Sequence, residues 1–471
     1  MRTECTPVQI EFKGLGRRKV QGAFDGGHIS SDGGAVLLRE VDLRLGITER
    51  LAGCFTDHRD PDLIEHSVLD LVRQRVYGIA LGYEDLNDHD GLKWDPLLAL
   101  SLGKGDVEGK ARRRQRDRGK ALASSSTLNR LELTPAQADR RSRYKKIVHH
   151  PEKLEALFVD VFLDSFKRAP KEIVLDFDAT DDPVHGDQEG KFFHGYYGCY
   201  CYLPLYVTCG DHLLVAKLRT SDRDGADGST PVLAYLVERI RARWPKVRII
   251  VRGDSGFARD GIMAWCESYG IYYLLGLARN ERLLEKIDAE LVQARDLYEQ
   301  TGHASRVFTQ FSYRTLKSWS RTRRVIAKAE HLSKGANPRF IVTNLPEDYA
   351  EPKTLYEKHY CARGDMENRI KEQQLDLFAD RTSTHTMRAN QLRLWFSSVA
   401  YVLMSALRRA GLKGTTLANA TCGTIRLKLL KIGAQIKISV RRILIHFASA
   451  CPYQDVFRHA WQNLQHYPLR C

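Results

Sequence analysis

The order of the apolar runs between residues 172 and 278 constrains the fold more than any other feature of this sequence. Three runs rich in β-branched and aromatic residues come first, KEIVLDFDAT, YYGCYCYLPLYVTC and HLLVAKLRT, and a Gly-Asp pair joins the last two. They are followed by the helical pattern TPVLAYLVERIRARW, the strand pattern VRIIVRGDSG, the helical pattern ARDGIMAWCESYG and the strand pattern IYYLLGLA. The sequence therefore predicts three strands in succession, then helix, strand, helix and strand.

This order predicts an α/β sheet of the ribonuclease-H-like kind, because a generic doubly wound fold alternates strand and helix from its first strand. Three more β-rich runs follow residue 280, RVFTQFSYRTL, TRRVIAKAEHL and PRFIVTNL, and we interpret them as an antiparallel insertion rather than helices. A helix is expected around YEKHYCARGDMENRIKEQQ. The expected regions are a mostly helical N-terminal region at 1–150, a ribonuclease-H-like core at 170–280 and 350–380, a β-rich insertion at 281–349 and a basic helical C-terminal region at 381–471.

The charge of the chain favours a polyanionic partner. The formal net charge is +15, and the stretch from residue 381 to 454 contains twelve Lys or Arg and no Asp or Glu. Such unrelieved positive charge repels itself unless an anionic partner is present, and nucleic acid is the first candidate. Ribosomal and membrane-surface proteins share this property, so charge alone leaves the partner open.

Composition also predicts where the protein works. No apolar run approaches the roughly 20 residues of a membrane-spanning helix, and the N-terminus lacks the apolar segment of a signal peptide. We therefore expect a cytoplasmic protein with no membrane partner and no small-molecule substrate. The ten cysteines are scattered without a CxxC pair, so we interpret them as core thiols rather than zinc ligands.

Acidic residues gather at the end of the first predicted strand, in VLDFDATDDP. Side chains alternate along a strand, so Asp176 and Asp178 share one face while the apolar residues between them take the other. Two carboxylates on one face repel each other unless a cation neutralises them, and hard oxygen ligands suit Mg²⁺ or Mn²⁺. Asp181 and Asp182 lie close enough to compete as ligands.

Two further acidic residues are candidates for the same site. Asp254 follows the strand VRIIV, at the edge of an α/β sheet where ligands collect, although a helix N-cap explains it equally well. Tyr360, Arg363, Glu367 and Lys371 recur at helical spacing and so share one face. That face is either a surface ion-pair ladder or a phosphate-handling face around a metal ligand, and spacing alone does not decide.

Other basic segments are candidate DNA contacts. The segment GKGDVEGKARRRQRDRGK is either a solvated loop or a set of phosphate contacts, and we favour the contacts. A capped helix beginning near Ser126 would expose Asn129 and Arg130, either as the reading element of a helix-turn-helix or as a linker helix. The candidate DNA-binding residues outside the acidic site are Arg112, Arg113, Arg114, Arg130, Arg441 and Arg442.

Together these motifs resemble a known family. The pattern D-x-T at 178–180, the strand-end Asp254 and the spacing Tyr360-x-x-Arg363-x-x-x-Glu367 resemble the DDE transposases of bacterial insertion sequences. Longer segments, including DATDDPVHGDQEGKFFHGYYGCYCYLPLYV, VRGDSGF and ANPRFIVTNL, are similar to the thirteen-eighty family, also called the group 1 DDE transposases. The resemblance extends from HISSDGGAVLLREVD to LLKIGAQI, which is nearly the whole chain.

The resemblance implies a catalytic core in which Asp178, Asp254 and Glu367 hold two Mg²⁺ or Mn²⁺ ions, with no other cofactor. Two such ions, about 3.5 to 4 Å apart, support in-line displacement at phosphorus. Better-known relatives carry a lysine seven residues after the glutamate, where this chain has Gln374. Lys371, one turn after Glu367, is the candidate replacement.

The activity that the resemblance implies is transposition. Water would release a 3′-hydroxyl at the element end, and that hydroxyl would attack target DNA. Arg363 would hold a phosphate and Tyr360 would contact the terminal nucleotide. The expected partners are the terminal inverted repeats, the target DNA and a second copy of the chain, because two ends must be paired. The alternatives are a catalytically silent DNA-binding protein derived from a transposase and a metal-dependent nuclease without strand transfer.

Overall fold

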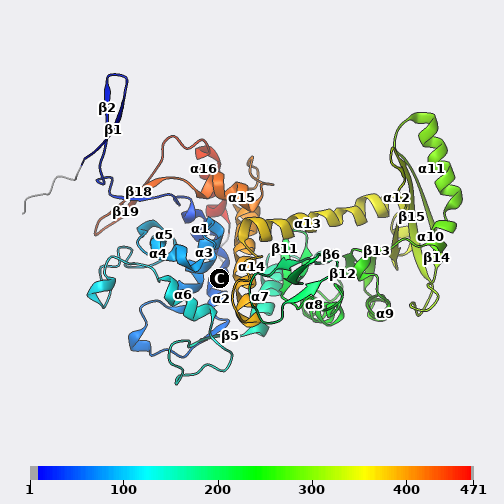
Figure 1. Ribbon diagram of the computed structural model, residues 1–471, viewed down its shortest axis with the longest axis horizontal. Helices are drawn as coiled ribbons and strands as arrows, with labels where there is room; N and C mark the ends of the chain where they lie inside the picture. Colours follow the sequence, from blue (N-terminus) through cyan, green and yellow to red (C-terminus); the bar gives the residue numbers. More distant parts are fainter. Residues whose placement is uncertain (1–8, 468–471) are drawn as a thin grey trace, which may run out of the picture. The chain divides into compact units, whose positions relative to one another are not determined.

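The computed structural model describes residues 9–467, which divide into two compact units (Figure 1). We call residues 150–398 the central unit, and residues 1–149 together with 399–471 the terminal unit. The central unit holds the large sheet and the terminal unit holds most of the short helices. None of the helices within residues 9–467 has the length and apolar character that crossing a membrane requires.

The central sheet begins with the five strands that the sequence predicts. Their order is β11-β10-β6-β12-β13, so the third, second, first, fourth and fifth strands of the core lie side by side. The strand β10 is antiparallel to both β6 and β11, whereas β12 runs parallel to β6 and to β13. This is the ribonuclease-H-like order, and it confirms the predicted fold class. The strands are β6 (Glu172–Ala179), β10 (Leu205–Cys209), β11 (His212–Lys217), β12 (Arg248–Gly253) and β13 (Tyr272–Leu277).

Burial follows the alternation of side chains along β6. Ile173, Leu175 and Phe177 are buried in an apolar cluster that also contains residues of three helices, which cover that face of the sheet. On the other face a smaller cluster forms around Ile250 and Leu355. The helices on the first face are α7 (Pro151–Asp164), α8 (Ser229–Arg243) and α9 (Asp260–Ser268).

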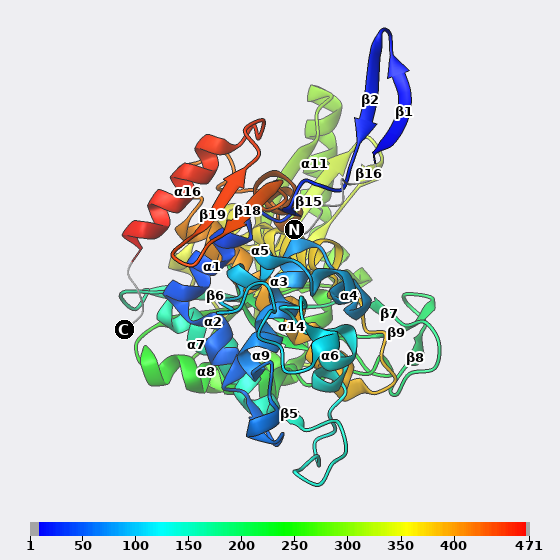
Figure 2. The same ribbon diagram turned by 90° about the vertical axis from the view of Figure 1, so that its left-hand side faces the viewer.

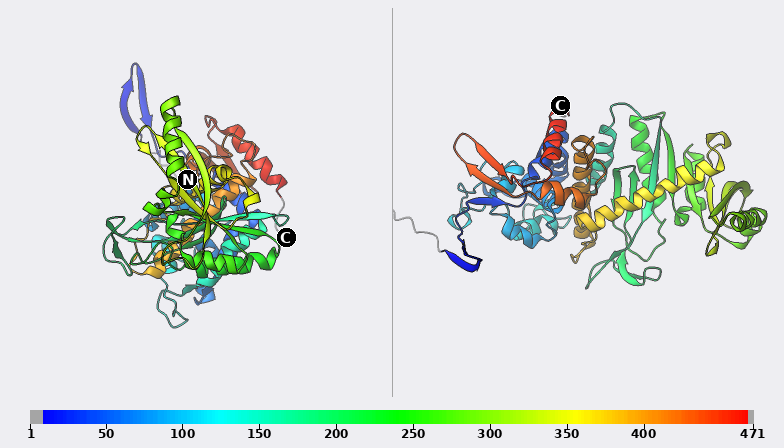
Figure 3. Two further views of the ribbon diagram at one scale, coloured as in Figure 1. Left: turned by 90° about the vertical axis from the view of Figure 1, so that its right-hand side faces the viewer. Right: turned by 90° about the horizontal axis from the view of Figure 1, so that it is seen from above.

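The insertion extends the same sheet. Strand β17 (Arg339–Thr343) pairs antiparallel with β13, and β15 (Arg323–Leu332) and β14 (Ser305–Tyr313) follow at the edge (Figure 3). The short β16 (Gly335–Ala336) pairs with β15. The core and insertion, which we expected as separate regions, therefore share one nine-stranded sheet.

Our expectation that strands alone follow residue 280 is wrong. Two helices come first, α10 (Glu281–Glu285) and α11 (Asp288–Thr301). The Asn280 side chain caps α10 by accepting a hydrogen bond from the Leu283 backbone N–H, and Gly302 ends α11 in the left-handed conformation. The Asn280 cap and Gly302 therefore favour helices in this segment. Ala294 packs α11 against the apolar cluster of the sheet.

The second face of the sheet carries one helical segment of irregular pitch, from α12 (Pro352–Thr354) through α13 (Gly364–Lys371) to residue 376 (Figure 3). Wider π-type turns occupy Leu355–Tyr360 and Glu372–Asp376. Such turns occur frequently at functional sites because they shift the side chains that follow them. The helix expected here is therefore present, and α14 (Met387–Ala410) comes next in the chain.

The terminal unit is built mainly from short helices. Helix α3 has a capping box between Ser67 and Asp70 and ends at Gly82 in the left-handed conformation, so local capping defines both of its ends. The other helices of this unit are α1 (Ala35–Leu45), α2 (Ile47–Ala52), α4 (His89–Leu92), α5 (Pro96–Ser101), α6 (Ser125–Glu132), α15 (Cys422–Ile425) and α16 (Gln454–His466), with α3 at Val68–Leu81.

The C-terminal region is not wholly helical, contrary to our expectation. Strands β18 (Ala434–Ile438) and β19 (Ile443–Phe447) form a hairpin that pairs with β3 (His28–Ser30) (Figure 2). The reason is the period-two alternation of isoleucines in AQIKI and ILIHF, which suits a strand rather than a helix. A second hairpin, β1 (Ile10–Leu15) with β2 (Arg18–Gly22), stands near the N-terminus. The other short strands are β4 (Phe55–Asp57) paired with β5 (Ile147–His149), and β7 (Asp182–Pro183), β8 (Phe192–His194) and β9 (Cys199–Tyr202) in a small sheet.

Candidate active site

Two of the three predicted acidic residues meet at one edge of the central sheet. Asp178 lies at the carboxyl end of β6, and Asp254 directly follows the carboxyl end of β12. The parallel register pairs Gly253 with Phe177, so the next residues, Asp254 and Asp178, stand level on neighbouring strands. Neighbouring strands are about 4.8 Å apart, which brings both carboxylates to the same place.

The third acidic residue comes from the helical segment on that face. Helix α13 contacts β6 and carries Glu367. The Arg363 guanidinium lies between the two carboxylates: its Nη1 is 3.4 Å from Oδ2 of Asp178, and its Nη2 is 2.6 Å from Oε1 of Glu367. The structure therefore brings Asp178, Asp254 and Glu367 to a shared site, although 76 and 113 residues of sequence separate them in turn.

The electrostatics of the site centre on Asp178. Burial is the largest cause that raises the pKa of this carboxyl to about 7; the negative charges of Asp254 and Glu367 add to it, and Arg363 opposes it. The side chain of Asp178 is 16% exposed, whereas that of Glu367 is 44% exposed. The site is thus short of positive charge even with Arg363 present.

Asp254 has the capping role that the sequence offers as one of its two interpretations. Its Oδ1 accepts a 2.8 Å hydrogen bond from the backbone N–H of Gly256, which makes it the cap of the short turn that follows β12. The same residue lines a cavity at the edge of the sheet. Capping fixes the position of the carboxylate, so the structural role supports a role in the site.

The neighbouring acidic residues have other partners. Both oxygens of buried Asp176 accept hydrogen bonds from Arg252, at 2.5 Å from Nε and 2.8 Å from Nη2. Arg252 also donates to the backbone carbonyl of His359, which ties the helical segment to the sheet. Buried Asp182 accepts a 3.0 Å hydrogen bond from Oγ1 of Thr382. Among these acidic residues the geometry favours Asp178 as the one facing the site.

Gln374 and Lys371, the two positions considered for the lysine of better-known relatives, lie apart from the carboxylates. Nε2 of Gln374 donates a 3.0 Å hydrogen bond to the backbone carbonyl of Asp181. Lys371 is exposed and has no ion-pair partner within residues 9–467. Of the possible surface ion-pair ladder on this helix face, the described residues therefore contain the pair Arg363–Glu367 and lack the pair Glu367–Lys371.

A cavity of about 700 Å³ opens beside the carboxylates. Three of the candidate residues from the sequence, Asp254, Tyr360 and Arg363, line it. Sequence reasoning missed Arg279, after β13, and Arg339, at the start of β17, because only the fold brings the insertion beside the core. The available signals in the sequence were Arg279, which follows a predicted strand, and Arg339, which begins the next β-rich run. The remaining lining residues are Ser255, Gly276, Leu277, Ala278, Asn337, Pro338, Phe340 and Tyr356.

Gly276 allows the elements that form the wall of this cavity to pack closely together. A Cβ atom at this position would lie 2.5 Å from Oη of Tyr360 and 2.8 Å from the backbone N of Ser255. The helical segment packs so closely on β13 that no side chain fits between them. Gly276 therefore lets the Tyr360 hydroxyl approach Asp254.

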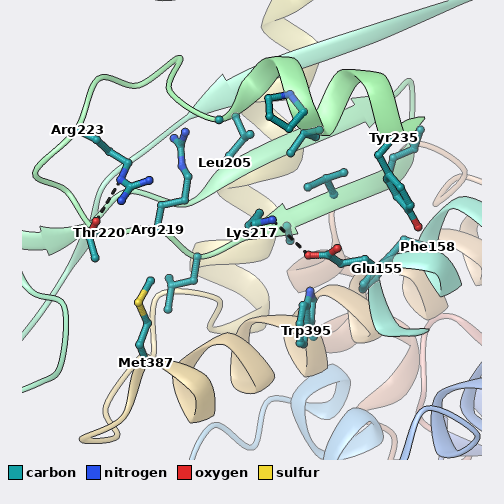
Figure 4. A pocket seen from close by; sticks show the side chains of 17 residues that line it. Glu155, Phe158, Leu205, Lys217, Arg219, Thr220, Arg223, Tyr235, Met387 and Trp395 are labelled. Carbon is teal, nitrogen blue, oxygen red and sulfur yellow. Dashed lines mark hydrogen bonds and ion pairs between the residues drawn. The ribbon is translucent and has the colours of Figure 1, made fainter. Parts of the chain in front are cut away.

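A second cavity, of about 530 Å³, lies beside the edge strand β11 (Figure 4). Its walls come from α7, α8 and α14. Lys217 forms an ion pair with Glu155, and Nε of Arg223 donates a hydrogen bond to Oγ1 of Thr220. The side chain of Gln391, on α14, accepts a hydrogen bond from the backbone N–H of Leu218 and donates one to the backbone carbonyl of Ala216. These two hydrogen bonds cover part of the exposed edge of the sheet. None of the three candidate acidic residues lines this cavity.

The predicted DNA contacts of the terminal unit occupy three places. Arg112 lies 3.3 Å from Glu65, and the Arg113 side chain donates to the carbonyl of Asp62, so part of the basic segment is held, whereas Arg114 is exposed. Asn129 and Arg130 line a cavity of about 410 Å³ together with the exposed aromatic ring of Tyr144. The exposed Arg441 and Arg442 lie in the turn between β18 and β19.

The three carboxylates differ from a formed metal site in their arrangement but not in their chemistry. Within residues 9–467, no group of three or more His, Cys, Asp or Glu side chains is already drawn together around a metal position. The donor type nevertheless fits, because hard carboxylate oxygens suit Mg²⁺ or Mn²⁺ and the raised pKa of Asp178 shows a need for positive charge. Arg363 supplies only part of that charge between Asp178 and Glu367.

Comparison with known proteins identifies relatives of the chain. A family model described as transposase DDE domain group 1 matches residues 12–469. No curated protein matches. Among solved structures, one similar chain is that of the piggyBac transposase in a cryo-EM synaptic complex with hairpin DNA. It shares 12% identity with a TM-score of 0.40, over 84% of this chain and 79% of that chain.

Proposed function

The chain belongs to the transposase DDE domain group 1 family, and from this premise we propose that it is the transposase of a bacterial insertion sequence. It binds the terminal inverted repeats, cleaves DNA at the element ends and joins the 3′-hydroxyl to target DNA. The observation that carries the proposal is the level placement of Asp178 and Asp254 at the ends of two parallel strands, with Arg363 and Glu367 brought to them by the helical segment that contains α13.

Asp178, Asp254 and Glu367 would hold two Mg²⁺ or Mn²⁺ ions, and such ions activate the attacking oxygen and stabilise the leaving oxygen of a phosphate diester. The buried Asp178 is the ligand that gains most from a cation, because burial and two neighbouring carboxylates oppose its ionisation. Arg363 then has its planar fork available for a DNA phosphate. Tyr360 and Arg279, in the cavity wall, contact the nucleotides beside the cleaved bond.

The pair Asp176 and Arg252 has a positioning role in this proposal. It joins β6 to β12 and reaches the carbonyl of His359, four residues before Arg363. The pair therefore fixes how the helical segment lies over the strand ends. Correct spacing between Glu367 and the two aspartates depends on that contact.

The partners follow from the reaction. DNA is the substrate, and pairing two element ends requires at least a homodimer in the active complex. The net charge of +15 favours association with DNA in the bacterial cytoplasm, where the chain would be associated with the nucleoid when bound.

The proposal is tested by incubating the purified full-length chain with labelled element-end DNA and Mg²⁺. Cleaved and joined products are scored for wild type, for Asp254→Asn and for the control Asp288→Asn, whose exposed carboxylate lies on α11. We expect joined products from wild type and the control, and none from Asp254→Asn. Cleavage without joining would indicate a nuclease, and end binding without cleavage in wild type would indicate a silent DNA-binding protein.

A further inference from the structure

Two β-hairpins of the terminal unit end in the same kind of tip. In β1–β2, Leu15 is followed by Gly16, Arg17 and Arg18; in β18–β19, Val440 is followed by Arg441 and Arg442. Leu15 is 75% exposed and Val440 is fully exposed. Each tip therefore presents one aliphatic side chain beside two arginines. We call these hairpins the N-terminal arm (residues 10–22) and the C-terminal arm (residues 434–447).

Both tips have defined turns. In the N-terminal arm Leu15 pairs with Arg18, and Gly16 between them has a φ of 60°, which a glycine adopts without strain. In the C-terminal arm the Ser439 N–H donates to the carbonyl of Arg442 at 3.0 Å, and the Ser439 hydroxyl donates to the same carbonyl at 2.9 Å. The aliphatic side chains are thus held outward by turn geometry.

The N-terminal arm lacks the packing that normally stabilises a hairpin. Within residues 9–467 its two strands pair only with each other, and every residue of β1 is exposed, including Phe12. An isolated two-stranded hairpin is marginally stable in water. This arm therefore gains stability when it contacts a partner.

The charges of the arms indicate the chemistry of that partner. The N-terminal arm contains one acidic residue, Glu11, and the C-terminal arm contains none. Among the described residues these arm cations have no ion-pair partners. The same-sign charges repel each other along each arm, so a polyanion relieves the repulsion. The cations are Lys13, Arg17, Arg18 and Lys19 in the first arm, and Lys437, Arg441 and Arg442 in the second.

The two arms are joined at their bases. Strand β3 pairs with β18 of the C-terminal arm, and only residues 23–27 separate β3 from the end of β2 (Figure 2). Both arms therefore extend from one three-stranded sheet of the terminal unit. One duplex can receive both arms.

We propose that the two arms bind duplex DNA, with their arginines against the phosphates and the minor groove, and with Leu15 and Val440 as wedges between base pairs. Apolar side chains inserted in this way unstack a base step and bend the duplex, and arginine favours a narrow minor groove. Proteins that read DNA with β-strands use them in the major or the minor groove. The proposal rests on the proposed function, since the duplex is the element end.

A second copy of the chain is a poorer partner for the arms. A symmetric contact between identical arms would place arginines against arginines. The apolar part of each tip is one side chain, which is too small for a stable protein interface. Charge and size therefore favour DNA.

The test measures binding and bending separately from cleavage. The full chain carrying Asp178→Asn is titrated against a duplex copied from the end of its element, labelled at both ends for fluorescence energy transfer, at about 50 to 200 mM salt. Arm variants in this background are Arg17→Ala/Arg18→Ala, Arg441→Ala/Arg442→Ala, Leu15→Ser and Val440→Ser. The control is Leu316→Ser, an equally exposed leucine of the insertion.

We expect each double arginine variant to weaken binding at least about tenfold at 150 mM salt and to lower the salt slope by about 2. The two serine variants should bind within about threefold of the parent but bend the duplex less, and the control should match the parent.

Parent-like binding and bending in all arm variants would overturn the proposal. So would a change of dimerisation with DNA binding unaltered, which would assign the arms to a protein contact. A parent that fails to bind the duplex at all would overturn the proposed function as well.

Discussion

Asp176 and Asp178 are two residues apart on the same face of β6, yet they have different environments. Both oxygens of Asp176 accept hydrogen bonds from Arg252 of the neighbouring strand. The only basic side chain that forms an ion pair with Asp178 among the described residues is Arg363, at 3.4 Å and from a separate helical segment. The comparison teaches that residue type and strand face do not decide between a structural and a reactive carboxylate. The two aspartates differ instead in the geometry of their contact with an arginine and in the segment of the chain that supplies this arginine.

The largest expected effect comes from removing the charge of Asp178. We expect Asp178→Asn to lower DNA cleavage and joining at least about 10³-fold, or roughly 4 kcal/mol in the barrier, because a proposed metal ligand is lost. DNA binding should stay within about threefold of wild type, because the basic surfaces are unchanged. The readouts are product yield and Kd for element-end DNA. Normal cleavage by the variant would contradict the contrast between the two aspartates.

Asp176→Asn should act on stability instead. It leaves Arg252 buried beside a neutral partner, and breaking a buried pair costs about 3 kcal/mol. We expect a clear fall in the midpoint of urea unfolding. The double variant Asp176→Asn/Arg252→Met should recover part of the loss, since it removes the unpaired charge. Unchanged stability of the single variant would show that the pair does not hold the sheet and helical segment together.

The pH dependence sharpens the comparison further. The folded pKa of Asp178 is raised to about 7 from an ordinary value of 3.8, so its contribution to stability is complete below pH 4 and is lost as the pH rises through 7. Asp178→Asn should therefore stabilise the metal-free protein at pH 8 by about 1 kcal/mol or more. Mg²⁺ should raise the Tm of wild type more at pH 8 than at pH 5. A variant less stable than wild type at pH 8 would contradict this sign.

The smallest effect is expected for Lys371→Ala. Lys371 is exposed and has no ion-pair partner among the described residues, so its loss should reduce cleavage no more than about threefold, through weakened phosphate attraction. Cleavage rates measured beside the control Lys334→Ala, an exposed lysine of the insertion, check this. A hundredfold loss specific to Lys371 would show that it replaces the lysine expected at position 374.

Much of the fold could be predicted because its signals are local. Strand runs such as VLDF and VRIIV have period-two or continuous apolar patterns, and Asp254 follows its strand directly, so the meeting of Asp178 and Asp254 follows from the parallel arrangement. The helix carrying Glu367 was also predictable from spacing.

The rest depended on competing local signals or on distant partners. In TIRLKLLKIGAQIKISVRRIL a helical pattern changes to a strand pattern near Gly433, and reading it with one period missed β18 and β19. The cap at Asn280 was a usable signal for α10 that the β-rich runs after it obscured. The pairing of Asp176 with Arg252, and the placement of Arg339 beside Asp254, arise only from packing between segments remote in sequence.

Manganese binding, followed by electron paramagnetic resonance at neutral pH, tests most directly whether the three carboxylates form one metal site. The free Mn²⁺ signal should fall on titration with wild type and with Asp288→Asn, and each of Asp178→Asn, Asp254→Asn and Glu367→Gln should abolish the saturable part of that fall. Identical Mn²⁺ binding by all five folded proteins would contradict the account.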